Sequence, residues 1–110
     1  MKLINGIVRP SRLDAVKAAL DRIRVNDVMV TSVQDHAQRG HGSTVWRGHV
    51  YELGYSQRLE IRFVVDDEDV DEAVQAVMQA ARTGENGDGH VSVIAVEHRY
   101  NIQTGAREAS

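Results

Sequence analysis

The sequence predicts an α+β domain in which a strand–helix–strand unit occurs twice. Three observations predict it: four segments have strand-like composition or alternation, two space their apolar residues as helices do, and one long insertion separates the two units. In a chain of 110 residues, this order most economically forms a single domain, residues 1–110, with both helices on one face of a four-stranded sheet. This is the ferredoxin-like βαββαβ sandwich. Its open face would keep apolar side chains, so we expect copies of the chain to cover it as a closed homo-oligomer.

The first unit opens on residues 2–10, which read as a strand that ends at the only proline, Pro10. Residues 11–24 carry apolar side chains at helical spacing, and we expect Ser11 to cap the N-terminus of that helix. Residues 27–33, which are rich in β-branched side chains, complete the unit as a strand.

The second unit repeats this order. Residues 58–65 alternate apolar and polar side chains, the pattern of a strand with one buried face. The acidic run 66–72 starts a helix, where negative charge suits the positive end of the helix dipole. We expect Gly84 to end this helix in the left-handed conformation, and residues 90–100 to form the last strand.

Composition excludes several classes of function. The chain has no cysteine, which removes disulfides, thiolate zinc sites and cysteine nucleophiles, and it fits a cytoplasmic protein. The net charge of −3 argues against a groove that coats nucleic acid, and no apolar run approaches the roughly 18 residues of a membrane span. No serine lies in a G-x-S-x-G context, and we expect no enzyme activity, no metal site and no bound cofactor.

The stretch RTGENGDGH, residues 82–90, holds three glycines within six residues. The glycines follow a helix and precede a strand, the reverse of a dinucleotide-binding fingerprint, and no Walker G-K-[ST] sequence follows them. Two interpretations stay open from spacing alone. The stretch is either a helix stop followed by a turn, or a run of backbone N–H groups that forms an anion-binding nest.

The insertion between the units, roughly residues 34–57, is too long for an ordinary connection inside a compact domain. It holds the only tryptophan, Trp46, together with two tyrosines, three histidines and four glycines. We expect it to order on meeting a ligand or a partner protein. His36 and His41 leave a metal site within it as the alternative interpretation.

Several motifs together resemble the PII signal-transduction family. They are RLDAVKAAL, the WRG..Y run, VVDDEDVDEAV, RTG..GDG and the closing I.TG. The resemblance implies a homotrimer of ferredoxin-like subunits that binds adenine nucleotides in the clefts between subunits. It makes residues 82–90 the phosphate-facing loop and residues 36–56 the signalling loop that reaches a regulated protein. The C-terminal segment, residues 100–110, would help to close the neighbouring cleft.

The resemblance also assigns roles to individual residues. Most of the nucleotide-binding residues would line one side of a cleft, which residues 101–103 of the neighbouring chain would close. The implied nucleotide-binding set is Val28, Met29, His36, Ala37, Gln38, Val64, Arg82, Gly87, Asp88, Gly89, His90, Asn101 and Gln103. Arg39 and Arg58 would hold an anion or metabolite, and Trp46, Arg47 and Tyr51 would meet the partner. Tyr51 also stands where some family members are uridylylated.

Departures from the family pattern refine the expected ligand. His90 stands where the family usually has lysine, and Asn101 and Gln103 stand where it usually has arginine. Three permanent charges that meet the polyphosphate are thereby missing, and charge-assisted bonds to phosphate are roughly twice as strong as neutral ones. We therefore expect AMP or ADP to compete well with ATP, or to bind more tightly.

The metabolite site departs from the family as well. Arg39 replaces a glutamine that coordinates magnesium in typical members, so we expect no 2-oxoglutarate sensing. Arg58 replaces a lysine and could hold bicarbonate, because its planar fork suits planar anions. Divergent members linked to carboxysomes or bicarbonate transport show this kind of drift. The expected partner is therefore a transporter, an enzyme or a carboxysome component, in inorganic-carbon or nitrogen metabolism. The alternative function for this chain is that of a trimeric metal-binding protein that uses loop histidines.

Overall fold

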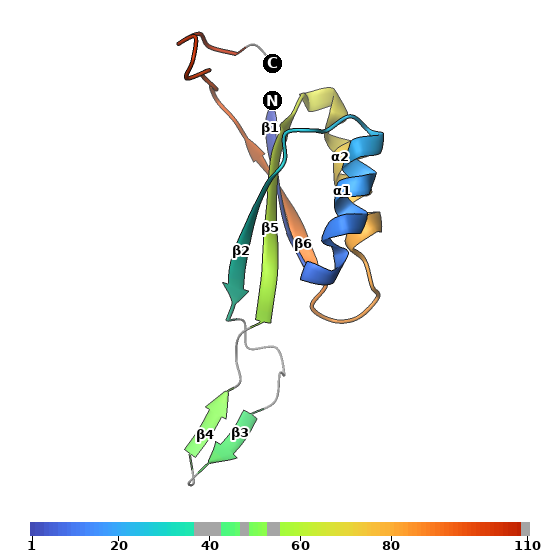
Figure 1. Ribbon diagram of the computed structural model, residues 1–110, viewed down its shortest axis with the longest axis vertical. Helices are drawn as coiled ribbons and strands as arrows, with labels where there is room; N and C mark the ends of the chain where they lie inside the picture. Colours follow the sequence, from blue (N-terminus) through green and yellow to red (C-terminus); the bar gives the residue numbers. More distant parts are fainter. Residues whose placement is uncertain (37–42, 47–48, 53–55, 109–110) are drawn as a thin grey trace.

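The computed structural model describes residues 1–36, 43–46, 49–52 and 56–108. Its strands and helices follow the predicted order, with one additional hairpin inside the insertion (Figure 1). They are β1 (Lys2–Val8), η1 (Pro10–Arg12), α1 (Leu13–Arg22), β2 (Met29–Asp35), β3 (Ser43–Trp46), β4 (His49–Glu52), β5 (Ser56–Val65), η2 (Asp67–Asp69), α2 (Val70–Ala81) and β6 (Gly89–Ala95). None of the helices in this described part is long and apolar enough to cross a membrane.

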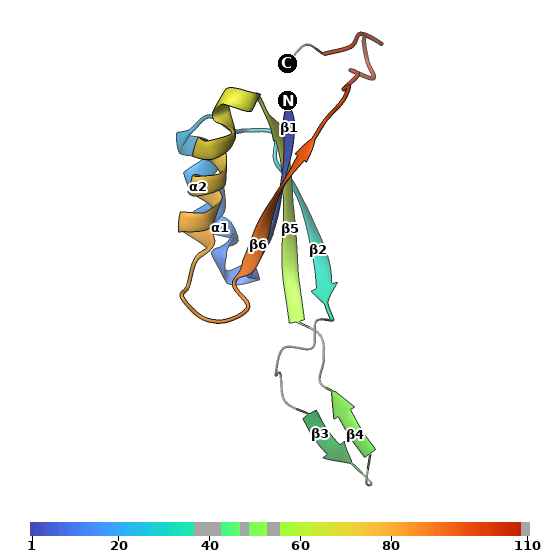
Figure 2. The same cartoon turned by 180° about the vertical axis from the view of Figure 1, so that it is seen from behind.

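The four long strands form one antiparallel sheet in the order β2-β5-β1-β6. Both helices cover the same face of this sheet, as the two opposite views show (Figures 1 and 2). The predicted α+β, ferredoxin-like arrangement is therefore confirmed. Strands β3 and β4 pair with each other alone, beyond the end of the sheet at which β2 ends and β5 begins (Figure 2).

The core lies between the sheet and the two helices, where the alternation of β5 predicted it. Every second residue of β5 from Ile61 to Val65 is buried, and the helices add small and branched side chains that fill the layer between them. The buried apolar set is Ile4, Val8, Val16, Leu20, Ile61, Phe63, Val65, Ala73, Val77 and Ala81.

The helix ends differ from the sequence predictions. Ser11 does not cap α1, because Pro10–Arg12 forms a short 3-10 turn and the helix begins one residue later, with Arg12 at the N-cap and no side-chain cap. Helix α2 ends at Ala81 in front of an extended Arg82, so Gly84 does not cap it. Gly84 does have the predicted positive φ, 89°, but it uses this conformation inside the following loop.

The open face of the sheet is apolar only in part. Its centre is polar: Asn5 Nδ2 donates to Glu60 Oε2 at 3.2 Å, and Arg62 Nε lies 3.5 Å from Glu60 Oε1. Apolar side chains flank this polar group toward the end of the sheet at which β1 begins. They include Met29 and Ile94, which are 61% and 45% exposed. Such a face suits contact with further copies, and the homotrimer stays a prediction because one chain is described.

Candidate functional site

The loop from Arg82 to Gly89 lies at the end of the sheet where β1 ends and β6 begins, called the loop end below (Figure 1). Three of its glycines have positive φ: 89° at Gly84, 84° at Gly87 and 114° at Gly89. A Cβ at Gly89 would lie 1.7 Å from the backbone oxygen of Ile7, so no other residue fits there. The path of this loop therefore depends on its glycines.

The Asp88 side chain occupies the nest of backbone donors. Asp88 Oδ2 accepts hydrogen bonds from the Thr83 N–H at 2.9 Å and the Gly84 N–H at 3.0 Å. Asp88 Oδ1 accepts one from the Thr83 hydroxyl and another from Arg9 Nε at 3.0 Å. These bonds, above all those from the Thr83 hydroxyl and N–H, hold the pKa of the Asp88 carboxyl far below its usual range. The nest exists, but in this chain its anion is a carboxylate of the same loop.

Two arginines, one directly after β1 and one in β5, bond the backbone carbonyls of the same loop. Arg9 Nη2 donates to the Asn86 carbonyl at 2.7 Å, and Arg58 Nη2 donates to the Gly87 carbonyl at 3.0 Å. Strand register explains why they meet. Val8 pairs with both Leu59 and Gly89. The row one position further toward the loop end therefore consists of Arg9, Arg58 and Asp88. Sequence reasoning missed Arg9 and Thr83, because neither stands out until this register is known.

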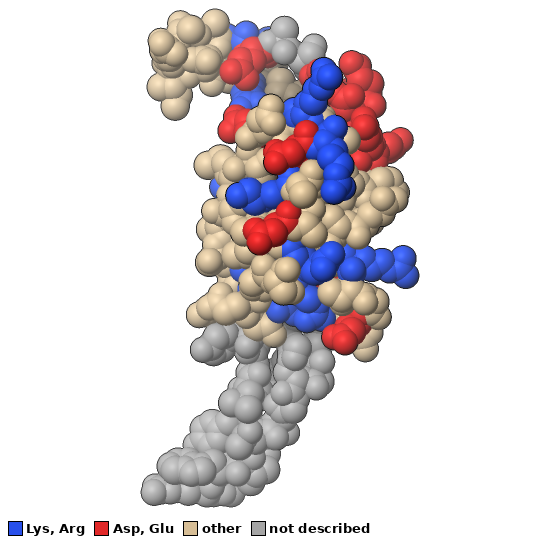
Figure 3. All heavy atoms as spheres, turned by 45° about the vertical axis from the view of Figure 1, so that its right-hand side comes forward, with Lys and Arg blue, Asp and Glu red and all other residues tan. Residues whose placement is uncertain are grey.

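Charge is distributed unequally between the two ends of the sheet. The loop end carries four arginines, which are Arg9, Arg12, Arg58 and Arg82. The opposite end, where β1 begins and β5 ends, is called the far end below. It carries the four consecutive acidic residues 66–69, all exposed, over η2 (Figure 3). The described residues of the loop end also include three carboxylates, those of Asp35, Glu85 and Asp88, so its net charge is only weakly positive. Positive charge attracts anions, because it raises their local concentration.

The implied nucleotide-binding residues do not line one side of a single chain. Leu3 pairs with Val64 at the far end and Val8 pairs with Gly89 at the loop end, so the two groups lie roughly 17 Å apart along β1. The expectation that one chain lines one side of the cleft with both groups is therefore wrong. The loop-end group is Arg82, Gly87, Asp88, Gly89 and His90, with His36 directly after β2; the far-end group is Val28, Met29, Val64, Asn101 and Gln103.

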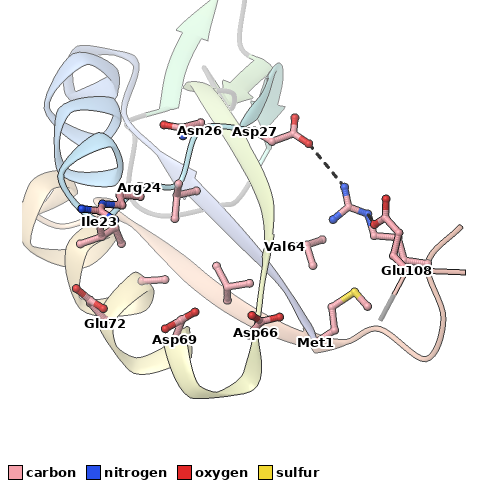
Figure 4. A pocket seen from close by; sticks show the side chains of 14 residues that line it. Met1, Ile23, Arg24, Asn26, Asp27, Val64, Asp66, Asp69, Glu72 and Glu108 are labelled. Atoms are coloured by element: carbon pink, nitrogen blue, oxygen red, sulfur yellow. Dashed lines mark ion pairs between the residues drawn. The ribbon is translucent and has the colours of Figure 1, made fainter. Parts of the chain in front are cut away.

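The far end has its own cleft, of about 480 Å³, which Val64 helps to line (Figure 4). Arg99 crosses one side of it: its Nη2 lies 3.7 Å from Asp27 Oδ2, the pair dashed in Figure 4, and its Nε lies 3.2 Å from Glu108 Oε2. The Arg99–Asp27 pair places the C-terminal segment next to the loop between α1 and β2, and the Arg99–Glu108 pair lies within the C-terminal part of the chain. Val28, Met29 and Val64 thus share an end of the sheet with residues 101–103.

The C-terminal segment forms a tight turn. Tyr100 and Arg107 form an isolated antiparallel β-bridge, and the Asn101 N–H donates to the Ala106 carbonyl at 2.9 Å. Asn101 Oδ1 accepts from the Thr104 N–H at 3.1 Å, so this amide stabilises its own turn. Ile102, at the tip, is fully exposed. Where the family usually has an arginine, this chain therefore has a turn-forming side chain.

The other predicted site residues lie in the insertion between β2 and β5. Ala37, Gln38, Arg39, His41 and Arg47 lie outside the described residues. Trp46 ends β3 opposite His49, and Tyr51 lies in β4 opposite Thr44, where only the strands are described. In the part of the chain that the structure describes, Asp66, Glu68 and Asp69 form the one close group of potential metal ligands. All three are exposed and none is a histidine, so the group does not correspond to the predicted alternative.

Comparison with known proteins decides the family. The family profile described as "Nitrogen regulatory protein P-II" matches residues 1–106, nearly the whole chain. This chain belongs to the P-II family. The P-II protein of Rhizobium etli is 36% identical over 110 residues, covering 99% of this chain and 97% of the relative. That of Rhodospirillum rubrum is 38% identical over 108 residues, and that of Nostoc punctiforme is 36% identical over 107 residues; each match covers 97% of this chain and 96% of the relative.

Membership in the P-II family indicates what kind of role the chain has. Relatives that match along nearly their whole length carry the name of a nitrogen regulatory protein, which describes a regulator and not a catalyst. The chain is therefore a member of a regulatory signalling family, as its motifs predicted. The ligand and the regulated protein are the questions that the two ends of the sheet help to answer.

Proposed function

We propose that this P-II protein senses an adenine nucleotide held between two copies of the chain. The phosphates would meet the 82–90 loop of one copy, and the base would meet Val28, Met29 and Val64 of the next. The observation that carries the proposal is the glycine loop, braced at the arginine-rich end of the sheet. Backbone at a glycine can approach a phosphate closely, and nearby positive charge attracts it.

The separation of the two residue groups supports a site between copies. A single chain offers a phosphate-facing surface at the loop end and a partly apolar cleft at the far end, roughly 17 Å apart. A nucleotide could touch both groups only where the loop end of one copy meets the far end of another. Closed assembly into a homotrimer would repeat this contact at each interface.

The missing charges favour a ligand with few phosphates. His90 is exposed at the start of β6, and its imidazole lacks the permanent positive charge of a lysine side chain. Asn101 is neutral and holds its own turn, and Gln103 is neutral as well. Each further phosphate would bring negative charge that these side chains do not compensate. AMP and ADP should therefore bind as tightly as ATP or more tightly.

Calorimetric titration with AMP, ADP and ATP, together with light scattering, tests the proposal. We expect saturable binding of AMP and ADP by an assembly of about three times 12.2 kDa. Failure of all three nucleotides to bind, or a monomer in solution, would overturn it. Tight binding of ATP without binding of AMP would contradict the charge argument alone and leave the inter-copy site intact.

Regulation would proceed through the segment between β2 and β5, which contains the β3–β4 hairpin. We propose that nucleotide occupancy changes which state of this segment is favoured, since a ligand shifts an equilibrium only by binding one state better. Its partner would be a transporter, an enzyme or a carboxysome component of inorganic-carbon metabolism. Repeating the titrations with bicarbonate and with 2-oxoglutarate tests this branch: bicarbonate should alter nucleotide affinity and 2-oxoglutarate should not. The opposite result would return the protein to nitrogen sensing.

A further inference from the structure

Arg58 is the one charged side chain among the described residues that is buried, with 8% of its surface exposed. Removing a guanidinium from water is costly unless its N–H groups find acceptors. Two nitrogens of Arg58 do so: Nη1 donates to the Gln57 carbonyl at 2.8 Å, and Nη2 donates to the Gly87 carbonyl at 3.0 Å. Both partners are backbone oxygens, so the side chain joins two segments of backbone.

These two segments have different roles in the molecule. Gln57 is the second residue of β5, immediately after the segment that contains the hairpin, and it pairs with Gln34 near the end of β2. Gly87 lies in the turn of the 82–90 loop with φ of 84°. Arg58 therefore connects the root of the hairpin segment to the loop that the proposed function assigns to phosphate.

A second guanidinium completes the grip on Gly87. A Cβ placed at Gly87 would lie 3.5 Å from Arg58 Nη2 and 3.7 Å from Arg9 Nη2. Arg9 bonds the preceding carbonyl, Asn86, and also the Asp88 carboxylate. Both guanidiniums thus lie beside Gly87, and they hold the successive carbonyls of Asn86 and Gly87.

We propose that Arg58 is a positioning residue that braces the 82–90 loop against the root of the hairpin segment. Its planar fork bonds two carbonyls at once, which the single ammonium of a lysine does not reproduce. The inference rests on the proposed function for its ligand, but the brace itself is a property of the unliganded chain. It also gives the start of β5, which follows the hairpin segment, a direct contact with the loop, and a ligand that shifts Gly87 must strain or break the bond to Arg58.

The test compares Arg58→Lys and Arg58→Gln with a matched control, Arg12→Gln. Arg12 lies at the same end of the sheet and its Nε also donates to a carbonyl, that of Ala80 at 2.9 Å, but this bond holds helix α2 and not the loop. Hydrogen exchange is followed at the amides of Thr83 and Gly84, which donate to Asp88. Affinity for AMP is measured in parallel, and thermal melting verifies that each variant folds.

Both Arg58 variants should speed exchange at these two amides and weaken AMP binding by about fivefold to tenfold, whereas Arg12→Gln should leave exchange at the two amides unchanged. Retention of wild-type exchange and affinity by Arg58→Lys, with loss in Arg58→Gln, would show that Arg58 acts through its charge and would overturn the brace. Unchanged exchange in both variants would overturn it as well. If the unaltered protein binds no nucleotide, the proposed function fails, and the exchange measurement still decides the role of Arg58.

Discussion

The two ends of the sheet are built in different ways. At the loop end, a carboxylate and two arginines fix a glycine-rich loop through hydrogen bonds to its backbone. At the far end, the C-terminal turn is attached by the ion pair of Arg99 with the exposed Asp27, and such a pair is worth little in water. The loop end is therefore preorganised within one chain, whereas the far end leaves exposed surface for other contacts. A site between copies would combine a rigid half with an adaptable one.

The largest test of loop-end rigidity is Gly89→Ala. A Cβ there would lie 1.7 Å from the Ile7 oxygen, and φ of 114° is strained for any other residue. Because the Ile7 oxygen belongs to the backbone of β1, β1 and β6 must separate locally to make room for the Cβ. We expect a loss of about 3 kcal/mol or more in the free energy of unfolding, seen as a melting temperature lower by roughly 10–20 °C.

Gly84→Ala is the matched control for that change. Gly84 also has positive φ, 89°, but a Cβ there would meet nothing within 4 Å. Only the conformational cost of about 1 kcal/mol should remain. Equal losses in the two variants would mean that the close approach of β1 to Gly89 does not determine the path of the loop.

The next test concerns the carboxylate that fills the nest, through Asp88→Asn. An amide lacks the charge that Arg9 Nε and the two loop N–H groups bind, so the variant should unfold at lower urea concentration than the parent at pH 7. The effect should lie between those of Gly89→Ala and Gly84→Ala. Urea unfolding followed by circular dichroism measures it.

The difference in stability between the parent and the Asp88→Asn variant should depend on pH. Hydrogen bonds, chiefly from Thr83, lower the pKa of the folded Asp88 carboxyl below its unfolded value of about 3.9. Its contribution is therefore complete above that unfolded value and is lost as the pH falls through the lower folded value. The gap in urea midpoint between parent and variant should narrow below about pH 4. A gap that stays constant from pH 7 to pH 3 would contradict an ionised Asp88 in the nest.

Sequence reasoning predicted the fold better than it predicted the site, for a physical reason. The alternation of apolar and polar side chains along β5 can be read from neighbouring residues in the sequence. It correctly indicated Ile61, Phe63 and Val65 as core residues. The loop end depends on a row of residues that lie 49 and 30 positions apart, Arg9, Arg58 and Asp88, and only strand register brings them together. No local pattern encodes such a row.

The nest shows the same limit at short range. Glycine spacing left open whether the loop was a simple turn or a run of backbone donors, and it did not reveal that Asp88 accepts from two of these donors. Family resemblance supplied the identities of the nucleotide-binding residues without their positions, so Val64 and Gly89 were expected on one side of a chain that separates them. Ser11 was expected as a cap, although the 3-10 turn after Pro10 moved the start of the helix.

The smallest expected effect concerns the far end, where a residue other than glycine has a positive φ. Arg24 has φ of 65° after helix α1, in a turn closed by the Val25 N–H donating to the Leu20 carbonyl at 2.9 Å. Left-handed backbone costs an L-residue roughly 1–2 kcal/mol, and glycine avoids this while losing more chain entropy on folding. Arg24→Gly should therefore raise the free energy of unfolding by roughly 0.5–1 kcal/mol. Arg22→Gly, the same change at the exposed last residue of the helix, should lower it by less than the roughly 1 kcal/mol that glycine costs in a helix interior. Thermal melting of the two variants should thus shift in opposite directions, and a loss of stability in both would mean that the far end carries no backbone strain that glycine can relieve.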